Sequence, residues 1–319
     1  MKLLLVLNFI SVFPWHITGV GHEHDDKKVN WNYRWNDTYG PKHWQEFYPK
    51  CGGKHQSPID IDPRFITIDN SIPEFKFVGW EKIRDNLYLH NNGHSLQVDI
   101  PKSDKIYVTG GGLNGVYDLA QFHLHWGQEP FWGSEHTIQG LHYPVEQHFV
   151  LEKRDYSTVK ERLSKSDGYA VLAVFFVISK EDKIYGREHP LDGALVNAST
   201  YDGIGYLGTI KPINLLPKNR ATFYRYHGSL TTPPCSEAVI WSLFTEPLEI
   251  SMDQIELFEA ISNKGGYHLE HNFRLVNPLN AVCVKALNGR GFITDSPYKS
   301  LAAGNACRCQ STERDVEPE

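Results

Sequence analysis

The run from Tyr169 to Ile178 is apolar at nearly every position, and it constrains the fold more than any other segment of the chain. A strand that is apolar on both faces must be covered on both sides, so this run predicts a strand whose two faces are both covered. Shorter strands separated by Gly, Asn and Pro are predicted over 87–90, 96–100, 120–126, 145–151 and 238–244. The sequence therefore predicts a fold dominated by sheet.

Helices are expected to be few and peripheral. The strongest helix signal begins near Ser251, where the segment 251–254 resembles a capping box. Ile255, Phe258 and Ile261 then recur at helical spacing. We expect this apolar stripe to pack against the sheet.

Length and charge limit the class of protein. The chain has 319 residues, 40% of them apolar, without internal repeats or Gly/Ser linkers, which favours one large domain. The formal net charge is -6, and no cluster of Lys and Arg is present. These features argue against nucleic acid and against a polybasic membrane surface, and they leave a small molecule as the expected partner.

The amino terminus has the pattern of a cleaved secretory signal over residues 1–21. Lys2 precedes a mostly apolar run over 3–15, small residues occupy 19–21, and a polar segment covers 22–30. No stretch approaches the roughly 20 apolar residues of a membrane helix. We therefore expect a secreted, extracellular protein with no membrane anchor, and Asn36 and Asn197 are glycosylation acceptors by sequence.

The five cysteines are an odd number for a secreted chain. One thiol is therefore free, capped or paired to another chain. The sequence alone does not assign the pairs.

Chemistry is concentrated in the segment 121–126, Gln-Phe-His-Leu-His-Trp. Side chains alternate along a strand, so His123 and His125 project from one face. His148 follows far enough along the chain for a neighbouring strand to present it to the same face. Three neutral imidazoles with no fourth protein ligand are typical of a catalytic zinc site with an open position. The alternative is a strand whose two polar positions simply face solvent.

Two further residues favour the metal over the solvated strand. Gln121 lies two positions before His123, and Glu146 lies two positions before His148. Each can accept a hydrogen bond from the distal nitrogen of a ligand histidine and so fix its tautomer. A solvated strand has no need of such partners.

The ordered blocks Gln-Ser-Pro-Ile-Asp-Ile at 56–61, Gln-x-His-x-His-Trp-Gly at 121–127, Ser-Glu-His-Thr at 134–137, Glu-x-His at 146–148 and Gly-Ser-Leu-Thr-Thr-Pro-Pro at 228–234 resemble the alpha class of carbonic anhydrases, specifically its secreted members. The resemblance covers about residues 31–286. It implies a single domain, mainly β with peripheral helices, built on a large, twisted, mostly antiparallel sheet of about ten strands.

The resemblance also implies roles for individual residues. His123, His125 and His148 match ligands of a zinc ion whose bound hydroxide attacks carbon dioxide to give bicarbonate and a proton. Thr231 matches the residue that accepts the hydrogen bond of the hydroxide and donates its own proton to Glu135. The implied cofactor is Zn2+.

The implied carbon dioxide pocket is apolar because the substrate carries no charge or dipole. Its walls match Val150, Val171, Leu230, Val239 and Trp241, and Thr232 is a further substrate-site residue. The alternative for any one wall residue taken alone is an ordinary core residue of a strand, whereas Leu230 and Thr232 flank Thr231. His94, in a polar segment with Asn92 and Gln97, matches the histidine that carries the product proton to solvent. The alternative for His94 is an exposed turn residue.

Cys51 and Cys235 match the single disulfide of secreted members. Residues 287–319 form an extension with Cys-x-Cys and an acidic tail. Cys283, Cys307 and Cys309 can form at most one internal bridge, so a spare thiol could link two chains as a dimer. The competing functional class is a non-catalytic binding or extracellular-matrix (mineralisation) protein on the same scaffold.

Overall fold

A computed structural model describes residues 30–179, 191–280 and 282–286. The predicted signal peptide, most of the polar segment that follows it and the tail over 287–319 lie outside the described residues. The strands are β1 Asp60–Ile61, β2 Thr67–Ile68, β3 Phe75–Val78, β4 Tyr88–Asn91, β5 Leu96–Asp99, β6 Tyr107–Gly110, β7 Tyr117–Trp126, β8 Thr137–Ile138, β9 Val145–Lys153, β10 Tyr169–Ser179, β11 Ile204–Tyr206, β12 Phe223–Gly228, β13 Val239–Phe244, β14 Leu248–Ser251 and β15 Lys285–Ala286. The α-helices are α1 Trp44–Phe47, α2 Val159–Arg162, α3 Leu191–Asn197 and α4 Met252–Phe258, and the 3-10 helices are η1 Pro49–Gly52, η2 Pro63–Phe65, η3 Lys102–Asp104 and η4 Pro212–Leu215.

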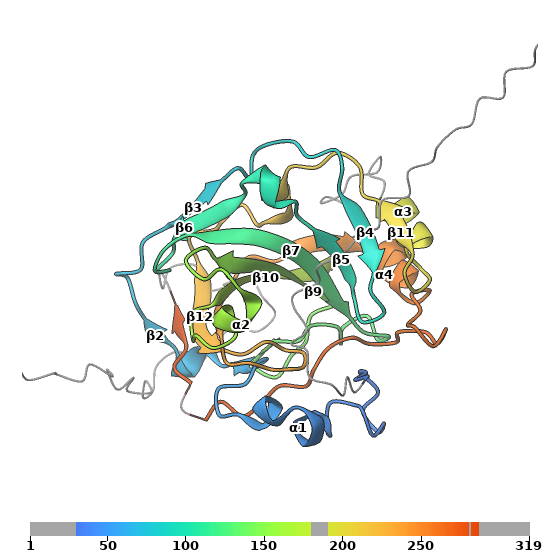
Figure 1. Cartoon of the computed structure of the whole chain (residues 1–319), viewed down its shortest axis with the longest axis horizontal. Helices are drawn as coiled ribbons and strands as arrows, with labels where there is room; N and C mark the ends of the chain where they lie inside the picture. The colour runs from blue at the N-terminus through green and yellow to red at the C-terminus, as the bar shows by residue number, and fades with distance from the viewer. Residues whose placement is uncertain (1–29, 180–190, 281, 287–319) are drawn as a thin grey trace, which may run out of the picture.

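A large sheet forms the centre of the molecule. Its main path runs β11-β4-β5-β7-β9-β10-β13-β12-β15-β2, and β3, β6 and β14 pair with strands of this path to complete 13 strands. Most neighbours are antiparallel, whereas β10 pairs with β13 and β14 in parallel and β15 pairs with β2 in parallel. Figure 1 shows β5, β7, β9 and β10 side by side across the middle of the molecule. The mainly antiparallel sheet predicted above is confirmed.

The apolar run that predicted a strand covered on both faces forms β10. This strand pairs with β9 on one side and with β13 and β14 on the other. Leu172 and Val174 pack in the hydrophobic cluster on one face of the sheet, and Val171 and Ala173 pack in the cluster on the opposite face. Both faces are covered, which is why no charged residue interrupts the first eight positions of the strand.

The predicted helix after residue 251 is α4, and it lies beside α3 at one side of the molecule (Figure 1). Its capping box is complete, because the Ser251 hydroxyl accepts from the Gln254 N–H and the Gln254 side chain accepts from the Ser251 N–H. Ile255 and Phe258 are buried. The Phe258 ring lies 5.0 Å from that of Trp126 at the end of β7, so the helix packs on the sheet as predicted.

The two faces of the sheet differ in chemistry. One face is covered by a large apolar cluster that includes Phe122, Leu124 and Phe149. The other face presents the polar residues of β7 and β9, next to a smaller cluster that includes Val150 and Trp241. Among the described residues, no helix has both the length and the apolar character needed to cross a membrane.

Candidate active site

Three histidines converge on the polar face of the sheet. His123 and His125 lie on β7, His148 lies on β9, and His123 is directly opposite His148 in the antiparallel ladder. One ring nitrogen from each histidine lies within 4.8 Å of the other two. His125 and His148 are buried, whereas His123 is half-buried. Solvent therefore approaches the cluster from the side of His123.

Two of the three histidines are held by side chains from their own strands. His123 Nδ1 lies 2.8 Å from Gln121 Oε1, and His148 Nε2 lies 2.6 Å from Glu146 Oε1. These contacts follow from the two-residue period of a strand, which places Gln121 and Glu146 on the ligand face. They leave His123 Nε2 and His148 Nδ1 for another partner.

His125 is held by a residue that the sequence did not indicate. Its Nδ1 lies 2.7 Å from the backbone carbonyl of Asn272. The Asn272 side chain also accepts from the Trp126 N–H at 2.7 Å and donates to the carbonyls of Leu124 at 2.9 Å and His94 at 3.1 Å. Asn272 therefore fixes the ring of one histidine and ties the end of β7 to the segment that carries another.

The environment keeps all three imidazoles neutral at pH 7. Burial, followed by the neighbouring histidines, holds the pKa of His123 well below 6.5, and burial and His148 lower the pKa of His125 to about 3. Burial also lowers the pKa of His148, against the opposing effect of Glu146. Among the described residues, the buried His125 Nε2 has no hydrogen-bond partner. Three neutral nitrogen donors, one of them an orphaned buried atom, fit a zinc ion.

Glu146 joins the cluster to a second, deeper histidine. His136 contacts Glu146 through its backbone N–H at 2.8 Å and its Nδ1 at 2.7 Å, and its Nε2 lies 2.6 Å from the Tyr226 hydroxyl. Tyr226 donates to the Ser57 hydroxyl at 2.9 Å. Burial alone would raise the pKa of Glu146, but His136 and His148 lower it well below its usual value. Glu146 is therefore an anion locked between two imidazoles.

Glu135 lies near the other nitrogen of His148, the one that Glu146 does not contact. One of its oxygens is 3.5 Å from His125 Nε2 and 3.9 Å from His148 Nδ1. Burial raises the pKa of Glu135, whereas a hydrogen bond from the Thr231 side chain and the Arg274 backbone N–H oppose this shift. The Arg274 N–H donates to Glu135 at 2.9 Å. Thr231 and Glu135 thus meet beside the histidine cluster.

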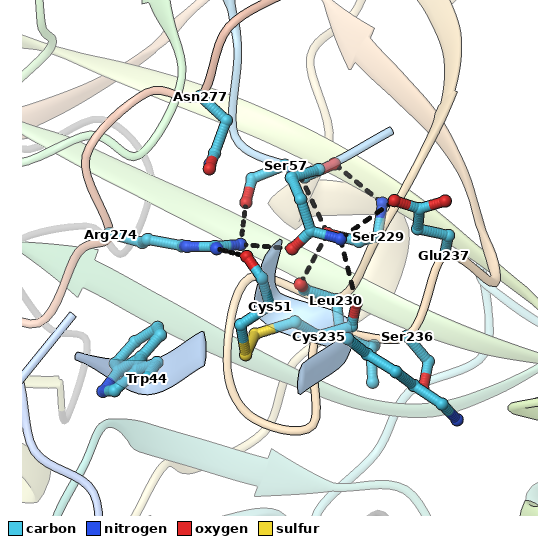
Figure 2. The surroundings of a disulfide bond; sticks show 12 residues. Trp44, Cys51, Ser57, Ser229, Leu230, Cys235, Ser236, Glu237, Arg274 and Asn277 are labelled. Carbon is cyan, nitrogen blue, oxygen red and sulfur yellow. Dashed lines mark hydrogen bonds between the residues drawn. A yellow bond between two sulfur atoms is a disulfide. The ribbon is translucent and has the colours of Figure 1, made fainter. Parts of the chain in front are cut away.

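A disulfide and the hydrogen bonds of Arg274 stabilise the region around the loop that carries Thr231. Figure 2 shows the Cys51–Cys235 disulfide, which is the pairing that the resemblance implied, next to the buried Arg274. The Arg274 guanidinium donates to the Gln56 side chain and to the carbonyls of Ser57 and Cys51, each at 2.9 Å. Burial lowers the pKa of this guanidinium to about 10, so it remains charged at neutral pH.

Hydrogen bonds hold the beginning of the same loop. The Ser229 hydroxyl accepts from the Ser57 N–H at 2.9 Å, and the Ser229 carbonyl accepts from Trp241 Nε1 at 3.1 Å. The Leu230 N–H donates to the Ser236 carbonyl at 3.0 Å. These bonds anchor the loop to β13 and to the segment around residue 57, and they fix where the next residue of the loop, Thr231, stands relative to the histidines.

An apolar wall lies beside His148. The residues that the resemblance assigned to the substrate pocket share one cluster on the polar side of the sheet, either buried within it or packed against it: Val150, Val171, Val239, Trp241 and Leu230. The Trp241 ring lies 4.8 Å from the His148 ring. Thr232 is half-buried beside Thr231. The apolar cluster therefore meets the three-histidine cluster where Trp241 contacts His148.

His94 lies in the turn between β4 and β5, where it is half-buried. Its ring stacks on the Trp31 ring, with the centroids 3.8 Å apart. The Asn92 side chain accepts from the His94 N–H at 2.9 Å and donates to the Gln97 side chain at 3.2 Å. A cavity of about 1190 Å³, lined in part by Trp31, Asn92 and His94, adjoins this turn.

Several residues of the site carry no local sequence signal. Asn272 and Arg274 reach it from the chain that follows α4, 147 and 139 residues away from the groups they contact. His136 and Trp31 also went unassigned. The one available hint was the place of His136, which directly follows Glu135 in the Ser-Glu-His-Thr block.

The sequence of this chain matches known proteins along most of its length. The profile of the eukaryotic-type carbonic anhydrase family matches residues 39–288. Putative carbonic anhydrase 3 of Caenorhabditis elegans is 36% identical over 79% of this chain and 95% of that protein. Human carbonic anhydrase 7 is 38% identical over 80% of this chain and 96% of its own length.

Carbonic anhydrase 6 of Mus musculus is 32% identical, and the match covers 81% of each protein. The family match extends over every element that builds the site, from β4 through β13 and the segment at 272–274. Together with the three-histidine cluster, these comparisons show that the chain belongs to the eukaryotic-type carbonic anhydrase family and is a carbonic anhydrase enzyme.

Proposed function

We propose that this chain catalyses the reversible hydration of carbon dioxide to bicarbonate and a proton, with zinc held by His123, His125 and His148. The observation that carries the proposal is that each imidazole has one nitrogen engaged by a different acceptor, while the other nitrogens converge. Zinc, when bound, lowers the pKa of a coordinated water to about 7, a value established for carbonic anhydrases as a class.

Thr231 and Glu135 would orient the reacting water. A threonine hydroxyl whose proton is donated to a carboxylate can only accept a hydrogen bond from that water. The contact between Thr231 and Glu135 supports this role. The Arg274 N–H also donates to Glu135, which helps to fix the carboxyl group in place.

Carbon dioxide would bind against the apolar wall beside His148. The substrate has no charge or dipole, so it is held by apolar contact rather than by hydrogen bonds. Four wall residues, Val150, Val171, Val239 and Trp241, lie on the adjacent strands β9, β10 and β13, and Leu230 packs against their cluster from the loop before β13. Their common face supports a substrate site within reach of the metal ligands.

His94 would carry the product proton to bulk water. An imidazole can take up and release a proton near neutral pH, and a half-buried ring that lines a cavity can exchange protons with solvent. The half-buried position of His94 and its stacking on Trp31 support this role.

Stopped-flow measurement of carbon dioxide hydration tests the proposal. The expected result is turnover that disappears when zinc is removed and returns when zinc is restored. His94→Ala should lower turnover in weak buffer, and added imidazole should restore it. A zinc-loaded protein without turnover would favour the alternative, a binding or matrix protein on this scaffold.

We also propose that the protein is secreted and glycosylated. The Cys51–Cys235 disulfide supports passage through an oxidising compartment, and both acceptor residues, Asn36 and Asn197, are exposed. Expression in a eukaryotic host should give a mature chain that begins near residue 22 and loses mass on treatment with a glycosidase. Retention inside the cell with an intact amino terminus would contradict secretion.

A disulfide-linked dimer is the remaining proposal about assembly. Cys283 is disulfide-bonded, and Cys51 and Cys235 pair with each other, so Cys307 and Cys309 are the candidates for its partner. One cysteine of the five would then be spare. A nonreducing gel should show a dimer that reduction converts to monomer, whereas monomer alone with one titratable thiol would contradict the proposal.

A further inference from the structure

A further histidine, His90, lies on the same face of the sheet as the metal-binding cluster. Residues directly opposite one another in an antiparallel sheet share a face. The register places His148 opposite His123, His123 opposite Gln97, and Gln97 opposite His90. His90 is therefore in the same row as two of the proposed zinc ligands, and two strand spacings, or about 10 Å, separate it from His123.

His90 contacts a carboxylate that faces solvent. Its Nε2 lies 2.9 Å from Asp202 Oδ1. The His90 side chain is 16% exposed, whereas that of Asp202 is 71% exposed. The pair thus extends from the partly covered sheet face to bulk water, at the side of the molecule where β4 and β11 lie (Figure 1).

One polar residue occupies the row between His90 and the three histidines. Gln97 stands between His90 and His123 in the register. Its amide accepts from Asn92 at 3.2 Å and donates to Asp99 at 2.7 Å. Fixed amides of this kind orient water molecules, so the row provides a hydrophilic path along the sheet from the metal site to its edge.

The other titratable groups near His90 lie on its own strand, β4, on the neighbouring strands β5 and β11, or in the segments next to these strands. On the sheet face these are Asp99 of β5, Tyr88 of β4 and Tyr206 of β11, and Asp202 precedes β11. His94 lies in the turn that follows β4. Among these groups, His90 and His94 are the ones whose side-chain type exchanges protons near neutral pH.

We infer that His90, supported by Asp202, is a second proton-accepting residue of this enzyme, which carries protons from the active site to bulk water in parallel with His94. The inference rests on the proposed function. When His90 is neutral, its Nε2 proton is donated to Asp202 and its Nδ1 accepts the incoming proton. The Nδ1 proton then leaves to water or buffer, while the Nε2 proton stays on the bond to Asp202, and His90 returns to its starting tautomer.

Exchange of 18O between carbon dioxide and water tests this role, because it measures two rates separately. One is the interconversion of carbon dioxide and bicarbonate, and the other is the proton-dependent release of labelled water. In zinc-loaded His94→Ala, adding His90→Gln should lower the second rate at least about threefold, a small part of the 10²- to 10⁴-fold typical of general acid–base catalysis. The first rate should not change, and added imidazole should restore the second.

A matched control and a pH profile separate proton transfer from a structural effect. His43 also contacts a carboxylate, with its Nδ1 2.7 Å from Glu46 Oε1, but it lies just before α1, away from the row. His43→Gln in the His94→Ala background should leave both rates unchanged. His90→Gln should also remove one ionisation from the pH profile of the second rate.

The two possible failures are distinguishable. If interconversion persists and His90→Gln changes neither the second rate nor its pH profile, the role of His90 is overturned and the proposed function stands. If zinc-loaded wild-type protein shows no interconversion, the proposed function fails, and the inference fails with it.

Discussion

At the scale of single residues, the cluster of His123, His125 and His148 is defined by the acceptor that contacts one ring nitrogen of each histidine. An amide oxygen holds His123, a backbone carbonyl holds His125, and a carboxylate holds His148. Only the last of these acceptors carries a charge. Glu146 is therefore the one charged group among the three acceptors that fix the rings, and each ring is held by a different kind of oxygen.

Gln121→Ala should weaken zinc binding by about 10- to 100-fold, because His123 loses the acceptor that fixes its tautomer. Competition with a chelator, followed by measurement of bound zinc, gives the affinity. Gln128 is exposed and lies on the same stretch of chain, so Gln128→Ala is the matched control and should bind zinc as wild type does. Equal affinities for the two variants would show that the Gln121 contact is dispensable.

Reasoning from the residues themselves indicated the local part of the site, and the family resemblance added distant residues such as Glu135, Thr231 and His94. The alternation along a strand pointed to Gln121 and Glu146 because each lies two residues from a ligand histidine. Asn272 and Arg274 contact residues 147 and 139 positions away, and no periodicity links such distant segments. Only folding brings them to the site.

At the scale of elements, β9 presents different chemistry on its two faces. Glu146 and His148 face the site, whereas Gln147 faces the opposite, apolar core between Leu124 of β7 and Val174 of β10. Gln147 is fully buried, and neither its amide nitrogen nor its oxygen has a hydrogen-bond partner among the described residues. An unpaired amide in an apolar core destabilises the fold.

Gln147→Leu should raise the free energy of unfolding by about 1–3 kcal/mol, the cost of leaving a buried polar group unpaired. Urea unfolding of the zinc-loaded protein measures the change. Gln56 is the control, because its buried amide donates to Cys235 and accepts from Arg274. Gln56→Leu should lower the free energy of unfolding, and a loss of stability in Gln147→Leu as well would contradict the argument.

The longer elements were predictable from sequence, and the shortest were not. The apolar run of β10 and the capping box of α4 are signals carried by several residues, and both elements form as expected. Two-residue strands such as β1, β2 and β15 are too short to show any alternation. Their pairing depends on chain segments that arrive from elsewhere in the fold.

At the scale of the whole molecule, the Cys51–Cys235 disulfide closes a loop with a sequence separation of 184. Replacing both cysteines by serine should lower the free energy of unfolding by up to about 5 kcal/mol in the chain-entropy view, because the unfolded chain regains its freedom. Chemical denaturation of the double variant and of wild type measures the difference. Equal midpoints would contradict this expectation and show that the disulfide does not change the free-energy difference between the folded and unfolded chains.

The stability of the whole molecule should also depend on pH through two histidines outside the metal site. His142 and His271 both pack against Phe273, at ring distances of 5.5 Å. Burial lowers the pKa of each below 6.5. The unfolded chain therefore binds protons at these residues before the folded protein does, so stability is present above about pH 6.5 and is lost as the pH falls toward the folded pKa values.

Replacing both histidines by glutamine removes this difference in proton binding. The free energy of unfolding of wild type should fall more steeply between about pH 7 and pH 5 than that of the double variant, because wild type alone takes up these protons on unfolding. Urea unfolding at several pH values gives both slopes. Parallel curves would mean that the pKa values of the two imidazoles do not differ between the folded and unfolded states. The loss of stability at low pH would then have to arise from other buried groups.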